Sequence, residues 1–260
     1  MDRVLEELMK NFPMLNAYLA AGIFIFARML GFFRLAPVFN RKEIPGTVKL
    51  ALILMFTVIL TCMVKPDVTI IKDSFALSIL LNMVVGALVG YVAQLILLAI
   101  DAGGDMINMQ MGLSSATVLD PTTSSQVSIL GKYFQVLGLL IFIQLGGVYW
   151  LFNALIHSIE IFPLDATAIP LSQLVNLDYV VKLSSNVLFM GLQIASPILL
   201  ATLGQDIILG IISKTAPQIN VFQLSFLFKP VLGATIMIFI LPMIIETIME
   251  YFNSYSSLFG

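Results

Sequence analysis

The residues that could perform chemistry in this chain are few, and the most suggestive pair is His157 beside Ser158. A histidine and a serine can supply the general base and the nucleophile of an acyl transfer. Adjacent side chains on a helix point in different directions, however, and no carboxylate that would orient the histidine is identifiable from the sequence. We therefore interpret His157 as a packing residue.

Other reactive groups give equally little support for an enzyme. Asp101, Asp105 and Asp120 could supply the paired carboxylates of an intramembrane protease, but they fall in a polar segment and not on facing apolar helices. Gly131 and Lys132 lack the upstream glycine and the following hydroxyl residue of a phosphate-binding loop. A single histidine and a single cysteine leave little from which to build a metal site or a disulfide. We expect no enzymatic activity and no catalytic, cofactor-binding or metal-binding residue.

The elements that carry these residues are strongly apolar. Of the 260 residues, 59% are hydrophobic and 11% are charged, and the mean hydropathy is +1.02. An average soluble domain has roughly 25% charged residues, and a chain of this size still exposes about a quarter of its unfolded surface after folding. Lipid or a large protein partner must therefore cover this chain. The net charge of -2 offers no basic surface, which excludes nucleic acid as a partner.

Hydropathy predicts an all-α protein with six apolar segments. Residues 1–15 precede them as an amphipathic helix whose mixed charge does not fit a secretory signal peptide, so we expect this end of the chain to be retained. The third and fourth segments exceed the ~20 residues that a membrane-spanning helix requires, whereas the second is too short to span comfortably alone. Near-equal numbers of Lys and Arg in alternate loops leave the orientation undecided. The six segments are 16–36, 50–64, 74–100, 133–159, 183–212 and 230–249.

Two of these segments contain polar residues that lipid disfavours. Arg28 and Arg34 lie in the first, and the fifth contains Pro197 and Asp206 as well as two glutamines. A charge at a helix centre costs at least about 2.5 kcal/mol on insertion scales, so such residues normally face protein or a wet cavity. Pro197 is expected to kink or split its helix. A broken, polar helix is also typical of secondary transporters, which provide the alternative function.

Gly86 and Gly90 form a G-x-x-x-G pattern in the third segment, where small residues permit close helix approach. The pattern fits either a dimer face or ordinary tight packing, and we favour packing because such matches are common in apolar helices.

The polar stretch 101–131 interrupts two of the most apolar segments and is predicted to be a long loop. Gly103 and Gly104 permit unusual backbone angles, and four Met and Leu residues follow them. Flexible Met side chains suit a surface that closes and re-forms around different shapes. A gate and a loop whose Met residues dock on neighbouring helices are both consistent with this composition.

Three groups of residues resemble one family over nearly the whole length. They are Arg28, Pro37, Ile44-Pro45 and Lys49; Gln110-Met111-Gly112-Leu113 with Asp120-Pro121; and Lys214-Thr215-Ala216-Pro217-Gln218-Ile219-Asn220-Val221-Phe222 with Lys229. With them the chain resembles the flagellar biosynthesis protein FliR family and its virulence type III secretion counterparts. The resemblance implies a core channel subunit of the flagellar type III protein export gate in the bacterial inner membrane, at the flagellar basal body.

A second resemblance concerns the last third of the chain. Ala195-Ser196-Pro197, Gln218-Ile219-Asn220, Leu224-Ser225-Phe226 and Lys229 resemble the two-helix partner FliQ. The family architecture therefore implies a FliP-like helical part over 1–182, which contains the loop 101–131, and a FliQ-like helical hairpin over 183–260. The partners it implies are FliP-like and FliQ-like subunits in one hetero-oligomer, FlhB-like and FlhA-like export proteins, unfolded flagellar proteins as substrates, and lipid.

The resemblance also implies roles for individual residues. We expect a plug that closes the channel, buried subunit contacts, and a cytoplasmic hairpin tip; for Arg34, snorkelling to headgroups is an equal alternative. The plug residues are Met106, Met109, Met111, Gly112, Leu113, Ser114, Thr117, Val118, Asp120 and Pro121. The subunit contacts are Arg28, Arg34 and Asp206, and the hairpin tip comprises Lys214, Pro217, Gln218, Ile219 and Asn220 with Lys229.

Overall fold

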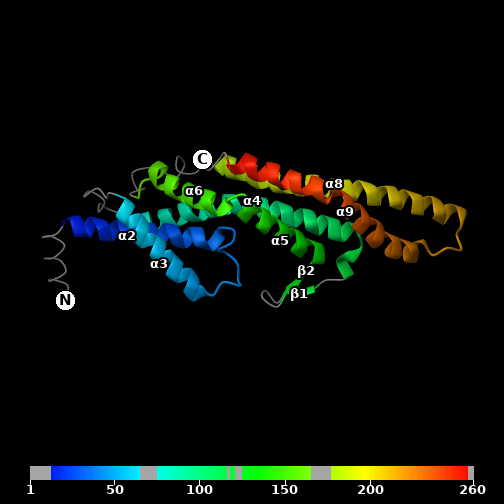
Figure 1. The fold of residues 1–260 in the computed structure, drawn as a ribbon, viewed down its shortest axis with the longest axis horizontal. Coiled ribbons are helices and arrows are strands. Elements are labelled where there is room, and N and C mark those ends of the chain that lie inside the picture. Colours follow the sequence, from blue (N-terminus) through cyan, green and yellow to red (C-terminus); the bar gives the residue numbers. More distant parts are fainter. Residues whose placement is uncertain (1–12, 65–74, 116–117, 121–124, 165–176, 257–260) are drawn as a thin grey trace. The chain divides into compact units, whose positions relative to one another are not determined.

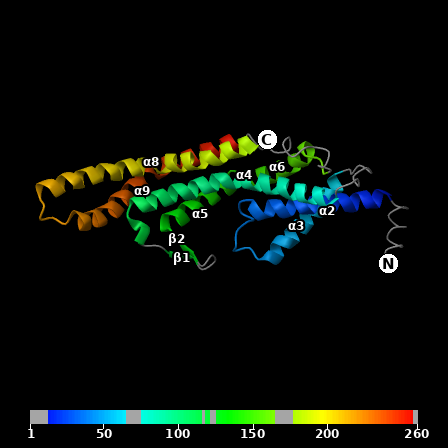
Figure 2. The same cartoon turned by 180° about the vertical axis from the view of Figure 1, so that it is seen from behind.

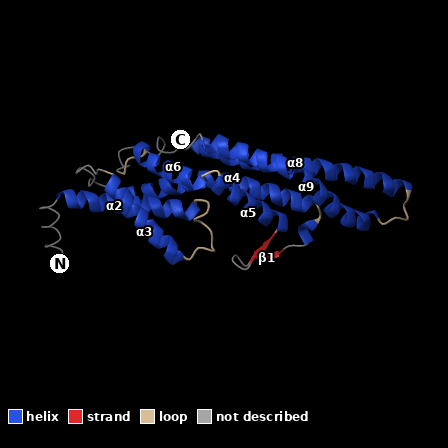
Figure 3. Ribbon diagram, in the orientation of Figure 1, coloured by secondary structure: helices blue, strands red, loops and turns tan. Residues whose placement is uncertain are grey.

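The computed structural model describes residues 13–64, 75–115, 118–120, 125–164 and 177–256. Apart from one two-stranded ribbon, the elements in these ranges are helices, which confirms the all-α class (Figures 1 and 3). The predicted N-terminal helix falls almost wholly outside the described residues. In chain order the elements are α2 (Pro13–Leu35), α3 (Gly46–Met63), α4 (Phe75–Gln110), η1 (Leu113–Ser115), β1 (Val118–Asp120), β2 (Ser125–Val127), α5 (Ile129–Gln144), α6 (Gly147–Ile161), α8 (Leu177–Thr215) and α9 (Val221–Ser256).

Each predicted apolar segment corresponds to helix, but the fourth is interrupted. It is divided into α5 and α6 at Leu145 and Gly146, where Gly146 adopts a positive φ of 76° that ends α5. Within the described residues, five helices are long and apolar enough to cross a membrane, or six if α5 and α6 count as one span. α3 begins at Gly46, so its 18 residues give about 27 Å of helix, close to the ~30 Å hydrocarbon core.

The predicted loop 101–131 is partly wrong, because α4 continues through Gln110. Gly103 and Gly104 lie inside this helix and serve close packing. A Cβ on Gly103 would lie 3.0 Å from the carbonyl oxygen of Gly191 on α8, and a Cβ on Gly104 would lie 3.0 Å from the Cα of Gly131 on α5. These glycines therefore let α4 approach two neighbouring helices. The true connection between α4 and α5 is shorter, residues 111–128.

Pro197 does not split its helix, since α8 runs from Leu177 to Thr215 with Pro197 inside it. Proline has no N–H, so the carbonyl of Gln193 loses its usual helical donor. The hydroxyl of Ser196 donates to that carbonyl at 2.9 Å. A neighbouring side chain thus replaces the missing backbone bond, and the helix continues.

The chain folds as two compact units. The first contains α2, α3, α4 up to Gln94, and α6 from Tyr149; the second contains α4 from Leu95, α5, α8 from Val181, and α9. The predicted division at 182/183 follows a resemblance and not compactness, and it stays a prediction.

In the first unit, α2 crosses α4 so closely that there is no room for a side chain between the two backbones at Gly86 and Gly90. A Cβ on Gly86 would overlap the carbonyl oxygen of Arg28, and a Cβ on Gly90 would lie 2.8 Å from that of Phe32. The G-x-x-x-G pattern therefore accommodates a helix of the same chain. Beside this crossing lies an aromatic cluster that joins α2 and α3 to α6: Phe32, Phe33, Phe39, Phe56 and Phe152.

In the second unit, α8 and α9 form a long antiparallel hairpin joined by residues 216–220. Both views show the two helices side by side (Figures 1 and 2). α5 starts at Ser128, whose side chain accepts a hydrogen bond from the N–H of Gly131 at 2.9 Å. Serine at this position satisfies one of the free N–H groups of the first turn.

Candidate functional site

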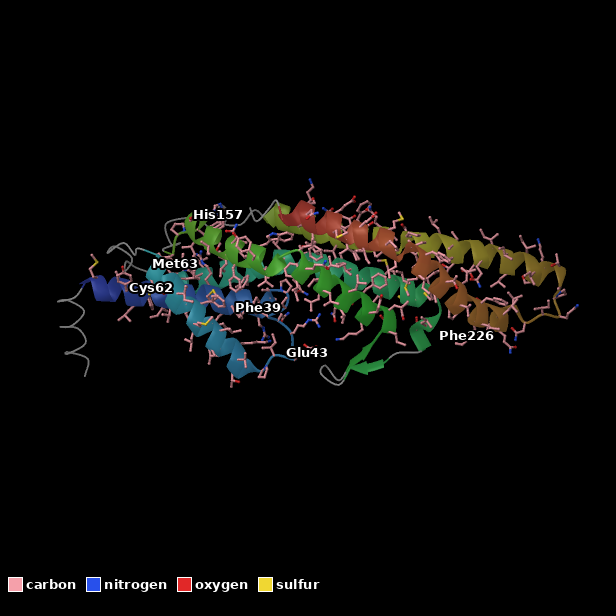
Figure 4. The ribbon with its side chains drawn as sticks, in the orientation of Figure 1. Phe39, Glu43, Cys62, Met63, His157 and Phe226 are labelled. Atoms are coloured by element: carbon pink, nitrogen blue, oxygen red, sulfur yellow. The ribbon has the colours of Figure 1, made fainter. Side chains whose placement is uncertain are left out.

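His157 and Ser158 do not form a nucleophile and base. His157 is labelled on α6 in Figure 4. Its side chain is 59% exposed, and its Nδ1 lies 2.9 Å from the Glu160 carboxylate. Ser158 is buried and donates its hydroxyl to the carbonyl of Leu155 at 2.6 Å. The expectation that His157 is a packing residue is wrong, because it is a surface residue with an acidic partner one helical turn away. No group of three metal-ligating side chains occurs in the described parts of the chain.

Among the residues that the structure describes, Arg28 is the largest fully buried side chain, with 1% of its surface exposed. Its Nε and Nη2 donate to Asn82 Oδ1 at 3.0 and 2.7 Å, and Nη2 also donates to the carbonyl of Phe162 at 2.8 Å. Nη1 donates to the carbonyl and hydroxyl oxygens of Ser158 at 2.7 and 3.3 Å. These five bonds match the five N–H donors of a guanidinium. No donor is left for a ligand.

The acceptors around Arg28 are all neutral, so its charge is balanced by dipoles. Ser158 is in the last turn of α6, and Phe162 follows its last residue. The free carbonyls at a helix C-terminus carry partial negative charge and attract cations. Asn82 extends the network, since its Nδ2 donates to the carbonyl of Leu164 at 2.9 Å. Arg28 therefore fastens α2 to α4 and to the end of α6.

This network gives Arg28 a role within the chain and leaves its predicted subunit contact untested. Arg34, in the last turn of α2, is exposed. Asn82 was not identified from the sequence, although a lone amide inside the apolar run of α4 is a visible signal. An amide in such a run needs polar partners, and an arginine in a neighbouring apolar segment is a natural one.

Asp206 has a partner within its own hairpin. Lys229 Nζ lies 2.8 and 2.9 Å from its two carboxylate oxygens, and both side chains are half-buried. Further along the same pair of helices, Tyr251 donates its hydroxyl to Gln193 Oε1 at 2.5 Å. The structure thus brings Asp206 and Lys229 together, although in the sequence analysis Asp206 was assigned to the subunit contacts and Lys229 to the hairpin tip. Two polar bridges hold α8 against α9.

The predicted hairpin tip lies in the connection between α8 and α9. Pro217 to Asn220 are exposed, as is Lys214 in the last turn of α8. Asn220 precedes α9, and its Oδ1 accepts from the N–H of Gln223 at 3.2 Å. This is an N-terminal cap, so Asn220 has a structural reason to stand there.

The predicted plug residues lie in three structural settings. Met106 and Met109 are on α4, half-buried and 70% exposed respectively, while Met111 is 2% exposed. Gly112 has a φ of 73° and ends α4, and Leu113 and Ser114 follow in η1. Val118 and Asp120 belong to β1, which pairs with β2 in the register Val118 to Val127 and Asp120 to Ser125. Thr117 and Pro121 lie outside the described residues.

The α4–α5 connection is held at both ends. On the α5 side, the hydroxyl of Ser128 donates to Asp105 Oδ1 on α4 while its oxygen caps α5. On the α4 side, Met111 lies against α9, where a Cβ on Gly233 would come within 2.6 to 2.9 Å of Met111 Cγ, Sδ and Cε. The short ribbon β1–β2 therefore extends from a connection whose two ends contact neighbouring helices. Sequence patterns did not reveal Gly233, because one glycine in an apolar run has no distinctive signature.

Residues 19–255 match the family described as "Bacterial export proteins, family 1". Relatives include the flagellar biosynthetic protein FliR of Buchnera aphidicola (subsp. Acyrthosiphon pisum), 29% identical over 84% of each chain. The FliR of Escherichia coli K12 is 27% identical over 84% of this chain and 82% of its own. The Yop proteins translocation protein T of Yersinia pestis is 29% identical over 64% of each chain. With a family match over most of its length, and with the apolar helices described above, the chain belongs to the bacterial export proteins, family 1, as a helical inner-membrane protein of the flagellar export apparatus.

Proposed function

We propose that this protein is a core channel subunit of the flagellar type III export gate, and that it assembles with FliP-like and FliQ-like subunits into the conduit for unfolded flagellar proteins. Membership in an export family supports a place in the apparatus. The observation that carries the more specific role is the length of the exposed apolar surface on the C-terminal hairpin.

Exposed apolar side chains extend along α8 from Val181 to Ile211. At ~1.5 Å per residue this is about 45 Å of helix, against a hydrocarbon core of ~30 Å. Even a 40° tilt, the upper end of the observed range, leaves roughly 34 Å along the bilayer normal. Hydrocarbon alone does not cover this surface, so apolar faces of neighbouring subunits provide the remaining cover.

α9 adds to the same surface. Phe222, Phe226 and Phe239 are all exposed along its length, and Phe226 is visible at the distal part of the hairpin (Figure 4). Large aromatic side chains of this kind are enriched at the centres of protein interfaces. In the assembly we assign α8 and α9 to contacts with FliP-like and FliQ-like subunits, and the tip Pro217–Asn220 to the cytoplasmic side near the FlhB-like and FlhA-like proteins.

We assign the closing function to the α4–α5 connection. The plug residues named above lie in this connection and at the adjoining end of α4, where the Asp105–Ser128 contact forms a fixed base. A segment fixed at its base and extended at its ribbon can block a channel and withdraw without unfolding the helices that carry it. Asp105 and Ser128 belong to the base and not to the moving part.

Co-expression with FliP-like and FliQ-like proteins tests the assembly. We expect one large complex that survives purification and shows a central channel by electron microscopy. A chain that purifies alone from the same cells, with no partner retained, would refute the channel-subunit role. Phe226→Ser and Phe239→Ser should weaken the complex, whereas Gly46→Ala, at a site with open space around it, should leave it intact.

Deletion of residues 112–122 tests the plug. Cells that express the complete complex with this deletion should leak ions and small molecules, since the helices and the base remain. Unchanged permeability in an assembled complex would refute the plug assignment.

The alternative function, a secondary transporter of small solutes, loses the observation that motivated it. α8 is not split at Pro197, and Asp206 is paired with Lys229 inside the hairpin. Purification of the chain alone with a bound solute is the result that would restore this alternative.

A further inference from the structure

Met111 is the first residue of the α4–α5 connection, directly after the end of α4, and its side chain occupies a notch on α9 at Gly233. Its sulfur and terminal methyl both lie 2.9 Å from the position that a Cβ on Gly233 would have. Real Cβ atoms do not tolerate such contacts, so the notch exists because residue 233 has no side chain. Among the methionines at the end of α4, Met111 is buried, whereas Met109 is 70% exposed.

Gly233 has no other evident reason to stand where it does. It lies in the interior of α9, where glycine is about 1 kcal/mol less favourable than alanine. Its backbone has ordinary helical angles, and it is buried. The space that Gly233 leaves for the thioether of Met111 explains why a glycine stands here despite this cost; we call this space the seat of Met111. Methionine suits such a seat because its unbranched chain can leave and re-enter without a large barrier.

The two ends of the connection differ in how they are held. On the α5 side, the Asp105–Ser128 bond and the close approach of Gly104 to Gly131 fix α5 to α4. On the α4 side, Met111 is followed directly by Gly112 in a left-handed conformation, where the chain turns. The Met111 seat is therefore the contact that joins the start of the connection to a helix of the C-terminal hairpin.

We propose that the Met111–Gly233 contact is a latch: seated, it positions the plug in the closed channel, and it must separate for the channel to open. The proposal rests on the plug assignment above. It makes α9 the helix whose displacement releases the plug, and it makes Met111 a positioning residue that acts through the segment after it.

A reversible crosslink tests whether separation is required. Met111→Cys with Gly233→Cys, in a Cys62→Ser background that removes the single native cysteine, places two thiols at a spacing compatible with a disulfide. In the complete complex we expect export to stop on oxidation and to resume with dithiothreitol. Each single substitution should not respond to the oxidant. If a quantitatively crosslinked complex exported as fast as the same complex after treatment with dithiothreitol, the proposal would be overturned.

Substitutions that change the size of residues 111 and 233 test whether the Met111–Gly233 contact holds the plug closed. Met111→Ala should cause leakage because the notch is empty, and Gly233→Ala should cause leakage because the new methyl displaces the thioether. The double variant puts one methyl on each side and should leak less than either single variant. Gly204→Ala is a matched control on α8, since its surroundings within 4 Å are open. Additive leakage in the double variant would count against a direct contact.

The failure of this proposal can be distinguished from the failure of the plug assignment. Leakage after deletion of 112–122, together with a crosslinked complex that still exports, would retain the plug and reject the latch. A complex that remains impermeable to ions and small molecules after that deletion would refute both the plug assignment and the latch.

Discussion

Replacement of Arg28 by leucine should destabilise the isolated chain, before any partner subunit is considered. The substitution leaves one buried acceptor without a donor, Asn82 Oδ1, and one partly buried acceptor, the carbonyl of Phe162. The Ser158 carbonyl keeps the N–H of Phe162 at 3.0 Å and is not lost. An orphaned buried acceptor costs about 1–3 kcal/mol, and the partly buried one costs less because water can reach it, so we expect a total of about 1–4 kcal/mol.

The assay is an unfolding titration with sodium dodecyl sulfate on the chain purified in mild detergent. Trp150, the single tryptophan, lies on α6 in the same unit as Arg28, so its fluorescence reports on this unit directly. Arg34→Leu is the matched control, because it removes an exposed arginine from the same helix. Its effect should stay within about 0.5 kcal/mol, as is usual for surface substitutions.

The network also predicts non-additivity. Asn82→Leu alone leaves a buried guanidinium with unpaired N–H groups, which is more costly than an unpaired neutral acceptor. The double variant Arg28→Leu with Asn82→Leu removes both groups, so its loss should be smaller than the sum by about 0.5–3 kcal/mol. Equal destabilisation by Arg28→Leu and Arg34→Leu would refute this account of the buried cation.

Three further substitutions test other contacts. Gly86→Leu should prevent α2 from crossing α4, at a cost of at least about 1–3 kcal/mol, and Gly46→Leu, in open space, should yield normal folded protein by size exclusion. Asp206→Leu should lower the free energy of unfolding by about 1.5–3 kcal/mol because Lys229 loses its charged partner, and adding Lys229→Leu should recover part of that loss. Ser128→Ala should cost about 0.5–2 kcal/mol through the lost cap of α5, with Ser114→Ala as an exposed control.

The hydropathy pattern predicted the helical elements well because an apolar run of this length has few other folded forms in a membrane. It failed where the same residue type can have either of two structural effects. Gly103 and Gly104 were interpreted as backbone freedom, although in α4 they provide close approach to α8 and α5. Pro197 was interpreted as a break, although Ser196 supplies the hydrogen bond that proline lacks. In both cases the deciding contact comes from a tertiary neighbour or a side-chain rotamer that composition does not specify.

The candidate site was predicted in part for the same reason. The polar stretch 101–131 and the Asp120-Pro121 turn marked the connection, because turn residues and a polar run are visible in one dimension, whereas the plug role came only from the family resemblance. The seat of Met111 was not visible, since it requires a glycine more than a hundred positions later to face the end of α4.

The polar residues of the apolar helices show a common rule that the charge count alone obscured. Arg28 makes five hydrogen bonds to four neutral acceptor atoms, Asp206 has Lys229, and Gln193 has Tyr251, all within the same chain. These three polar groups are thus already satisfied before assembly, whereas the buried amide of Gln205 on α8 has no hydrogen-bond partner and the apolar faces of α8 and α9 are exposed. We therefore expect assembly of the proposed gate to be driven by coverage of apolar surface and close packing, and charge pairing between subunits is not needed to explain these three sites. Raising the salt concentration should therefore leave the co-purified complex intact, and its dissociation at high salt would show that ion pairs between subunits carry the assembly.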